Sequence, residues 1–316
     1  MGHNASDSRR GRLVTAESRT VGTVLAMAPA LEPSLLDRYA EDGYLLLDSF
    51  VDADWLARLN QAMNHLIEQS RTAEPGDKRF DREPGHTAEE PRLRRINFPV
   101  DLDPVFAEFA LDGPATDLAE TLLGPDVRFH HSKLNIKWGG GGEEVKWHQD
   151  IQFWPHTDFS PLTIGVYLTD VDDEMGPMGI VPGSHTGELY DLTNPDGSWS
   201  GSLAEADVAR ANVDTADYLK GPAGSVTVHN CCCVHGSAPN DSNRSRPLLL
   251  QAYSRGDSFP LLGVGTNGKA DRSAHQLVRG RPPTSLTVQG RTMPAAPDWY
   301  RGTYGSIFSV QQGDDA

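Results

Sequence analysis

Short apolar segments separated by glycine and proline fill the chain from residue 127 onward, and they constrain its fold more than any other feature. The 316 residues include 31 glycines and 22 prolines, which favours many turns over long helices. Short strands joined by tight turns are typical of a β-sandwich or a jelly roll. The sequence therefore predicts a mainly β fold. The expected strands are Arg128–Trp138, Val145–Asp150, Leu162–Leu168, Gly179–Val181, Ser225–His229 and Leu248–Ser254.

Helices are predicted only before this region. Asp52 can cap a helix that runs for about eighteen residues, because apolar residues follow it at helical spacing. A second helix is expected over Pro114–Leu123, with proline at its first position and a Gly-Pro pair after its end. A short helix over Leu35–Ala40 and a strand over Tyr44–Leu47 are expected to precede them.

The chain is expected to form one domain over residues 31–316, preceded by a flexible tail over residues 1–30. Residues 71–93 are charged and rich in proline and glycine, which predicts a long loop of the kind that often covers a binding site. The part from Arg279 onward is expected to be an irregular extension anchored to the domain by aromatic side chains. These anchors are Trp299, Tyr300, Tyr304 and Phe308.

The chain is strongly acidic, with 28 Lys and Arg against 44 Asp and Glu and a net charge of −16. This balance disfavours nucleic acid and anionic membrane surfaces as partners. The sequence contains no long apolar run that would predict a membrane span. Its three cysteines, Cys231 to Cys233, are adjacent and cannot form a disulfide framework, which fits a reducing cytoplasm. We therefore expect a cytoplasmic protein with a small-molecule substrate, and a homodimer is the default assembly.

The main functional signal is the tetrapeptide WHQD, which contains His148 and Asp150. Residues two apart on a strand face the same side, so both side chains can point at one metal ion. A second imidazole would complete the 2-His-1-carboxylate triad, which favours Fe(II) and leaves coordination positions open for substrates. The preferred third ligand is His235, at the end of an extended run, and His185 and His229 are the alternatives.

Arg246 is a candidate for binding an organic acid beside this metal. It follows His235 by eleven residues and begins an apolar strand. When a dicarboxylic acid binds a metal through its keto-acid end, its far carboxylate can accept two parallel hydrogen bonds from a planar guanidinium. Arg244 is a rival for the same role.

Taken together, these residues resemble the phytanoyl-CoA dioxygenase (PhyH) family of Fe(II)/2-oxoglutarate-dependent oxygenases. The resemblance extends from about Leu36 to Ser254. Each piece alone is common, whereas the combination is specific. The matching pieces are Asp42-Gly43-Tyr44, His148-x-Asp150, Gly176-Pro177, Pro182-Gly183-Ser184-His185, His235-Gly236-Ser237-x-Pro239-Asn240 and Arg246.

The resemblance implies a double-stranded β-helix, which is a jelly-roll barrel with flanking helices. It also implies that His148, Asp150 and His235 bind Fe(II). The enzyme would then use 2-oxoglutarate and O2 to hydroxylate a C–H bond and release succinate and CO2. Related halogenases have Gly or Ala in place of the carboxylate, so the presence of Asp150 favours hydroxylation.

Part of the chain is similar to the ectoine hydroxylases of this family. In those enzymes, the Asn that matches Asn135 and a Gln at the place of His131 bind 2-oxoglutarate. Trp154 matches a tryptophan that walls the site, and Ser237 matches a serine that helps Arg246 hold the far carboxylate. His131 departs from the pattern, and the longer motif after the metal pair is not kept. The chain is therefore not identified as an ectoine hydroxylase.

The sequence does not specify the substrate. An amino acid, a small cationic solute and a secondary-metabolite intermediate are all compatible, and we favour the last two. A CoA ester is disfavoured because its phosphates need a basic patch. Two other classes of function are a cupin-like metal enzyme that does not use 2-oxoglutarate and an inactive binding member of the fold. The expected substrate contacts are Arg94, Arg95, Asn97, Gln152, Trp154 and the region near Phe259.

Overall fold

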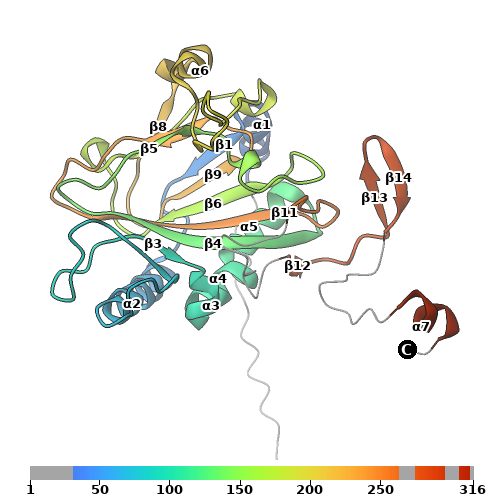
Figure 1. Ribbon diagram of the computed structural model, residues 1–316, viewed down its shortest axis with the longest axis horizontal. Coiled ribbons are helices and arrows are strands. Elements are labelled where there is room, and N and C mark those ends of the chain that lie inside the picture. Colours follow the sequence, from blue (N-terminus) through green and yellow to red (C-terminus); the bar gives the residue numbers. More distant parts are fainter. Residues whose placement is uncertain (1–30, 263–274, 296–305, 314–316) are drawn as a thin grey trace, which may run out of the picture.

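The computed structural model describes residues 31–262, 275–295 and 306–313. Its largest element is an antiparallel sheet in the order β1-β9-β6-β11-β4-β3-β2, in which β12 also pairs with β4 (Figure 1). We call it the major sheet. Its strands are β1 (Tyr44–Leu47), β2 (Phe80–Arg82), β3 (Leu93–Asn97), β4 (Val127–Lys137), β6 (Leu162–Tyr167), β9 (Val226–Asn230), β11 (Arg246–Arg255) and β12 (Leu277–Arg279).

A smaller antiparallel sheet, in the order β5-β10-β7-β8, faces the major sheet. Residues of both sheets line one small cavity, so the two sheets enclose a common interior. This arrangement confirms the double-stranded β-helix expected from the resemblance. The strands of this minor sheet are β5 (Val145–His148), β7 (Met178–Ile180), β8 (Asp217–Leu219) and β10 (His235–Ser237), and a separate hairpin is formed by β13 (Ser285–Val288) and β14 (Arg291–Pro294).

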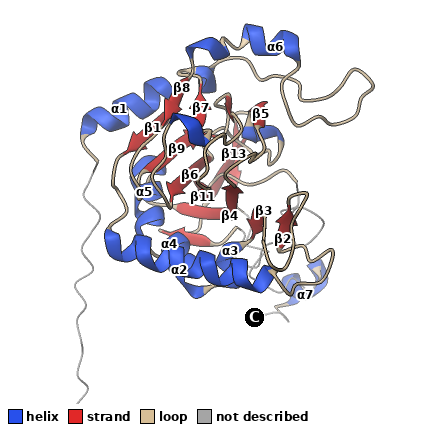
Figure 2. Cartoon of the chain, turned by 90° about the vertical axis from the view of Figure 1, so that its left-hand side faces the viewer, coloured by secondary structure: helices blue, strands red, loops and turns tan. Residues whose placement is uncertain are grey.

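Helices cover the face of the major sheet that points away from the minor sheet. Figure 2 shows α2, α3 and α4 beneath this sheet, and their apolar residues belong to the same core as its strands. None of the described helices is both long and apolar enough to cross a membrane. The helices are α1 (Pro33–Asp42), α2 (Ala53–Ser70), α3 (Pro99–Leu102), α4 (Pro104–Leu111), α5 (Pro114–Leu123), α6 (Glu205–Arg210) and α7 (Ile307–Gln312). The 3₁₀ turns are η1 (Asp150–Gln152), η2 (Asp173–Met175), η3 (Ser184–Thr186) and η4 (Val213–Thr215).

The two faces of the major sheet have different residues because side chains alternate along each strand. In β4, Leu134 and Ile136 are buried in the core shared with the helices, whereas Lys133 and Asn135 line the cavity on the other face. The pattern repeats in β11, where Leu249 belongs to the core and Leu248 lines the cavity. Each buried leucine or isoleucine contributes roughly 1.5–3 kcal/mol to stability, so the apolar face fixes which polar residues reach the interior.

One β-bulge interrupts the alternation in β4. Ala252 of β11 pairs with His131, but the next residue of β11, Tyr253, pairs with Phe129. His130 is therefore the extra residue of the bulge. Because of this bulge, both His130 and His131 line the interior while Phe129 stays in the core.

Several elements form as the sequence predicts, because their signals are local. Asp52 caps α2, and its carboxylate accepts a hydrogen bond from the amide of Trp55 at 2.8 Å. Helix α5 begins at Pro114 and ends before Gly124, and β1 has the predicted bounds. The other strand predictions differ from the structure by one or two residues at their ends.

The structure corrects other predictions. Residues 71–93, predicted as a loop, contain the strand β2, which pairs with β3. Helices α3 and α4 were not predicted, because each is short and begins at a proline after a turn. The strand predicted over Val145–Asp150 ends at His148, and Asp150 begins the turn η1 instead.

The predicted C-terminal extension is also corrected in part. Where irregular chain was expected after Arg279, the hairpin of β13 and β14 forms. The side chain of Phe308 is not an anchor, since 76% of it is exposed. Trp299, Tyr300 and Tyr304 lie outside the described residues, as does the predicted tail over residues 1–30.

The cap of α2 gives a test of the fold. Replacing Asp52 with Ala should lower the free energy of unfolding by about 0.5–2 kcal/mol, because the amide of Trp55 loses its acceptor. Urea denaturation followed by circular dichroism measures this change. Asp52→Asn is the matched control, since Asn also caps helices well, and it should stay close to the unmodified protein. Equal destabilisation by both variants would contradict the capping role.

Candidate functional site

The structure brings His148, Asp150 and His235 together at one point between the two sheets. His148 in β5 and His235 in β10 are directly paired across the minor sheet. Each of the three residues offers one ligand atom, and these atoms all lie within 4.8 Å of one another. Nε2 of His148 is 3.8 Å from Oδ1 of Asp150. The carboxylate reaches this point from the turn η1 rather than from the strand face on which the sequence placed it.

Backbone carbonyls orient the two imidazole rings. Nδ1 of His148 lies 2.8 Å from the carbonyl oxygen of Lys146, and Nδ1 of His235 lies 3.0 Å from that of Cys233. A carbonyl can only accept, so each Nδ1 carries the proton. Each Nε2 is then left as the unprotonated atom that can bind a metal.

The ionisation states of these groups suit a metal site. Burial lowers the pKa of His148, and burial together with the neighbouring imidazoles lowers the pKa of His235, so both rings are neutral. Burial opposes ionisation of Asp150, but Lys133 and the adjacent His229 outweigh it and hold the pKa of this carboxyl well below its usual range. Two neutral imidazoles and one carboxylate are the donor set of an Fe(II) facial triad.

The two alternative third ligands lie in different places. His229 is next to the triad, with Nε2 3.5 Å from Oδ2 of Asp150, so it contacts the carboxylate oxygen that faces away from His148. It is not part of the group of ligand atoms within 4.8 Å. His185 lies in the turn η3, packed against Gly43 and outside both cavities. Among the three candidates, His235 alone belongs to the cluster.

A small cavity of about 90 Å³ connects the triad to Arg246. Arg246 is only 3% exposed, and its Nε and Nη1 atoms have no hydrogen-bond partner. Ser237 and Asn135 line the same cavity. A buried guanidinium with unsatisfied donors is costly unless an anion binds it, so this cavity fits a carboxylate at the end opposite the triad. Arg244, the rival, is a surface residue that pairs with Asp172.

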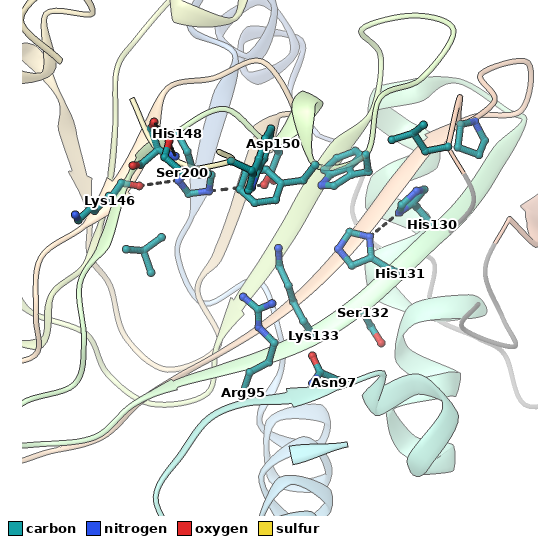
Figure 3. Close-up of a pocket in the computed structure, with 18 of the residues that line it drawn as sticks. Arg95, Asn97, His130, His131, Ser132, Lys133, Lys146, His148, Asp150 and Ser200 are labelled. Carbon is teal, nitrogen blue, oxygen red and sulfur yellow. Dashed lines mark hydrogen bonds and ion pairs between the residues drawn. The ribbon is translucent and has the colours of Figure 1, made fainter. Parts of the chain in front are cut away.

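A larger cavity of about 1090 Å³ opens from the same triad (Figure 3). It shares His148, Asp150, Arg95 and Lys133 with the small cavity. Of the residues expected to bind 2-oxoglutarate, His131 and Trp154 line this larger space instead of the small cavity. Burial, followed by the charge of Lys133, lowers the pKa of His131 to about 3, so this ring is neutral.

The expected substrate contacts divide into two groups. Arg95, Asn97 and Trp154 line the large cavity, and Pro260 and Leu262 of the segment after Phe259 do so as well. The side chains of Arg94 and Gln152 do not line it.

A β-bulge explains the case of Arg94. Asp81 of β2 pairs with Arg95 and Arg82 pairs with Leu93, so alternation is interrupted at Arg94, which is the extra residue of a bulge in β3; its guanidinium pairs with Glu143 at 2.6 Å. The amide of Gln152 is held by a hydrogen bond to the carbonyl of Tyr190. Neither side chain is therefore available to a ligand in the large cavity.

Sequence reasoning missed several lining residues. Lys133 lies two residues from both His131 and Asn135, so the alternation of β4 could have placed it on the same face. Phe153 and Trp199 meet at the mouth of the large cavity, with ring centroids 5.3 Å apart in an edge-to-face contact. Trp199 comes from a loop far along the chain, and no local pattern could have predicted its position.

Comparisons with known proteins agree with this geometry. The family model "Phytanoyl-CoA dioxygenase (PhyH)" matches residues 39–248. The "Probable alpha-ketoglutarate-dependent hypophosphite dioxygenase" of Stutzerimonas stutzeri is 34% identical over 239 residues, which cover 73% of this chain and 81% of that protein. An "Ectoine dioxygenase" of Stutzerimonas stutzeri (strain A1501) is 28% identical over 239 residues, 71% of this chain and 77% of the relative. The crystal structure of EctD from S. alaskensis with bound Fe has 25% identity and a TM-score of 0.64, over 80% of this chain and 88% of that one.

Lys137, which pairs with Arg246 across β4 and β11, predicts a pH dependence of stability. Burial, followed by the charge of Arg246, lowers the pKa of Lys137 from 10.5 to about 7. Between these two values the unfolded chain binds more protons at this residue than the folded chain does. Stability therefore rises with pH, by up to about 1.4 kcal/mol per pH unit from this one group.

Replacing Lys137 with Met should remove this contribution. The difference in unfolding free energy between the variant and the unmodified protein, measured in urea at pH values from 7 to 10, should change steadily with pH, because the titrations of all other groups cancel in it. A constant difference across that range would show that the pKa of Lys137 is not lowered.

Proposed function

The chain belongs to the phytanoyl-CoA dioxygenase family and is an iron- and 2-oxoglutarate-dependent dioxygenase, and from this premise we propose that it hydroxylates an unactivated C–H bond of a small organic molecule. The proposed iron ligands are Nε2 of His148, Nε2 of His235 and the carboxylate of Asp150. Their support is the convergence of three oriented ligand atoms within 4.8 Å.

The observation that carries the proposal is the position of Arg246. Its unsatisfied guanidinium is buried in the same small cavity as the triad, so a molecule that touches both needs an acid group at its far end. 2-Oxoglutarate has this form, with a keto-acid end for the metal and a second carboxylate for Arg246. In the proposed arrangement, Ser237 and Asn135 add polar contacts along its length. A cupin-like enzyme that does not use 2-oxoglutarate would have no use for this residue.

The protein's own contribution to the reaction is positioning and exclusion of water. Iron with 2-oxoglutarate and O2 supplies the oxidising chemistry and yields succinate and CO2. Leu248, Leu250 and Met178 line the small cavity and limit water beside the keto acid. His229 contacts the carboxylate of Asp150 and fixes its orientation. Asp150 is retained, and a carboxylate at this position favours hydroxylation over halogenation.

The named relatives give the first compounds to assay. Hypophosphite and ectoine are what two of the matched proteins act on by name, and succinate release in their presence would identify either as a substrate. Hypophosphite contains no C–H bond, so succinate release with hypophosphite but with no organic compound would contradict the proposed C–H hydroxylation. A response to neither compound would direct the search to other organic substrates.

Arg246→Ala tests the 2-oxoglutarate site. Removing one partner of a buried charge pair costs about 3–5 kcal/mol, so the affinity for 2-oxoglutarate should fall by about two to four orders of magnitude. The measurement is an anaerobic titration of the Fe(II)-loaded protein with 2-oxoglutarate, followed by the visible charge-transfer band of the chelated keto acid. The matched control is Arg244→Ala, because Arg244 lies two residues away but is exposed and pairs with Asp172. Unchanged affinity in Arg246→Ala would contradict the assignment.

The metal ligands have their own test. His148→Ala and His235→Ala should abolish Fe(II) retention after dialysis, since a facial triad that loses one of three ligands binds iron weakly. Iron content per chain is the readout. His185→Ala should retain iron, because that residue lies outside the cluster. Iron loss in His185→Ala together with iron retention in His235→Ala would reverse the choice between the two histidines.

A further inference from the structure

Two half-buried cations lie side by side in the wall of the large cavity. Asn97 of β3 pairs with Lys133 of β4, and Arg95 pairs with Asn135, so all four side chains project from the same face of the major sheet. Figure 3 shows Arg95 and Lys133 extending from neighbouring strands towards Asp150. Both residues also line the small cavity, which places them beside the proposed iron.

Neither cation forms an ion pair. Nε of Arg95 donates to Oδ1 of Asn135 at 2.8 Å, and no carboxylate of the described residues lies within 4.0 Å of either charged group. By contrast, other arginines of this acidic chain pair with carboxylates, including Arg94 on the same strand. Burial lowers the pKa of both Arg95 and Lys133, which means that the protein holds these charges at a cost.

The charge balance of the loaded site points to a further anion. Iron(II), Arg246, Arg95 and Lys133 bring five positive charges, whereas Asp150 and 2-oxoglutarate bring three negative charges. Among these groups two positive charges are left over, and Asp81, which also attracts Arg95, lies outside both cavities. Glu144 and Lys146, which also line the large cavity, cancel each other. A ligand with an acidic group would neutralise this excess in a place where water is limited.

The rest of the large cavity is suited to an apolar body. Trp154, Phe153 and Trp199 line it, and Phe153 and Trp199 are 47% and 51% exposed at its mouth. Pro260 and Leu262 complete this apolar side. The volume of about 1090 Å³ is at the upper end of the range for drug-sized ligands, which is far more than an inorganic oxyanion fills.

From these observations we propose that the substrate is an organic acid whose acidic group binds between Arg95 and Lys133, and whose apolar or aromatic body lies against Trp154, Phe153 and Trp199. The acidic group is a carboxylate or a phosphate, which share this chemistry. The inference rests on the proposed function. It also places the oxidised C–H close to the acidic group, because the two cations lie beside the proposed iron.

The test measures binding to the whole enzyme loaded with Fe(II) and 2-oxoglutarate without O2, so it does not depend on turnover. Binding is read from the change in the charge-transfer band and from titration calorimetry. The probes are phenylacetate, 3-phenylpropanoate and indole-3-acetate with their primary amides, then phenyl phosphate, and finally inorganic phosphate. Comparing the affinity for phenyl phosphate with that for the carboxylic acids shows which acidic group the site prefers. Comparing it with the affinity for inorganic phosphate shows whether the apolar body contributes to binding.

We expect at least one aryl acid or phenyl phosphate to bind roughly tenfold or more tightly than the uncharged amides. Lys133→Met and Arg95→Met should weaken that binding by roughly tenfold to a hundredfold, because each removes charge-assisted hydrogen bonds. Both residues also line the small cavity, so the affinity of these variants for 2-oxoglutarate should fall less than their affinity for the acid, and a charge-transfer band at saturating 2-oxoglutarate shows that the variants are folded. The matched control is Arg94→Met, which lies on the same strand but faces away from the cavity and should bind as the unmodified protein does.

Several results would overturn the proposal. These are equal binding of acids and amides, no response to any acid up to about 10 mM, or inorganic phosphate binding as tightly as phenyl phosphate. Another is a loss of 2-oxoglutarate affinity in Lys133→Met and Arg95→Met that is as large as their loss of affinity for the acid. That result would show that both residues bind the keto acid rather than the substrate. Failure of the proposed function looks different, since the unmodified enzyme would then give no charge-transfer band with 2-oxoglutarate.

Discussion

The alternation of side chains across the major sheet is the constraint on which the site depends. One face buries apolar residues such as Leu134 and Leu249 under the helices, and this burial is the main stabilising contribution of the sheet. The opposite face is then free to carry polar groups without weakening the core. Lys133 and Asn135 reach the interior because their neighbours are held in the core, so the packing of the helices and the composition of the site are determined together.

The sequence predicts the parts of the fold that have local causes. Asp52 as a cap and Pro114 as a first helical residue mark their helices directly. The spacing of His148 and Asp150 also identifies the candidate site, although Asp150 lies in a turn rather than on the strand. The pairing of β2 with β3 depends on contacts between distant segments, which no local pattern contains.

The distinction between Arg94 and Arg95 shows where sequence reasoning reaches its limit. The two residues are adjacent and chemically identical, but Arg95 pairs with Asn135 of β4 whereas Arg94 is left out of the pairing with β2, and only Arg95 lines the cavity. The overall acidity of the chain disfavours a CoA ester. Net charge describes the surface as a whole, whereas Arg95 and Lys133 make the interior locally positive. The local charge is the better guide to a ligand that is taken out of water.

The bulge at His130 interrupts the alternation of side chains between the two faces of β4. On its C-terminal side, odd-numbered residues face the interior, whereas on its N-terminal side Phe129 faces the core instead. Deleting this single residue would restore regular pairing and leave Phe129 in the core, because Phe129 already pairs with the residue that follows Ala252, but it would remove one imidazole from the space beside Trp154. The bulge therefore adds a side chain to the interior without turning over the residues on either side of it. Relatives that lack the extra residue must fill the space around Trp154 with different side chains.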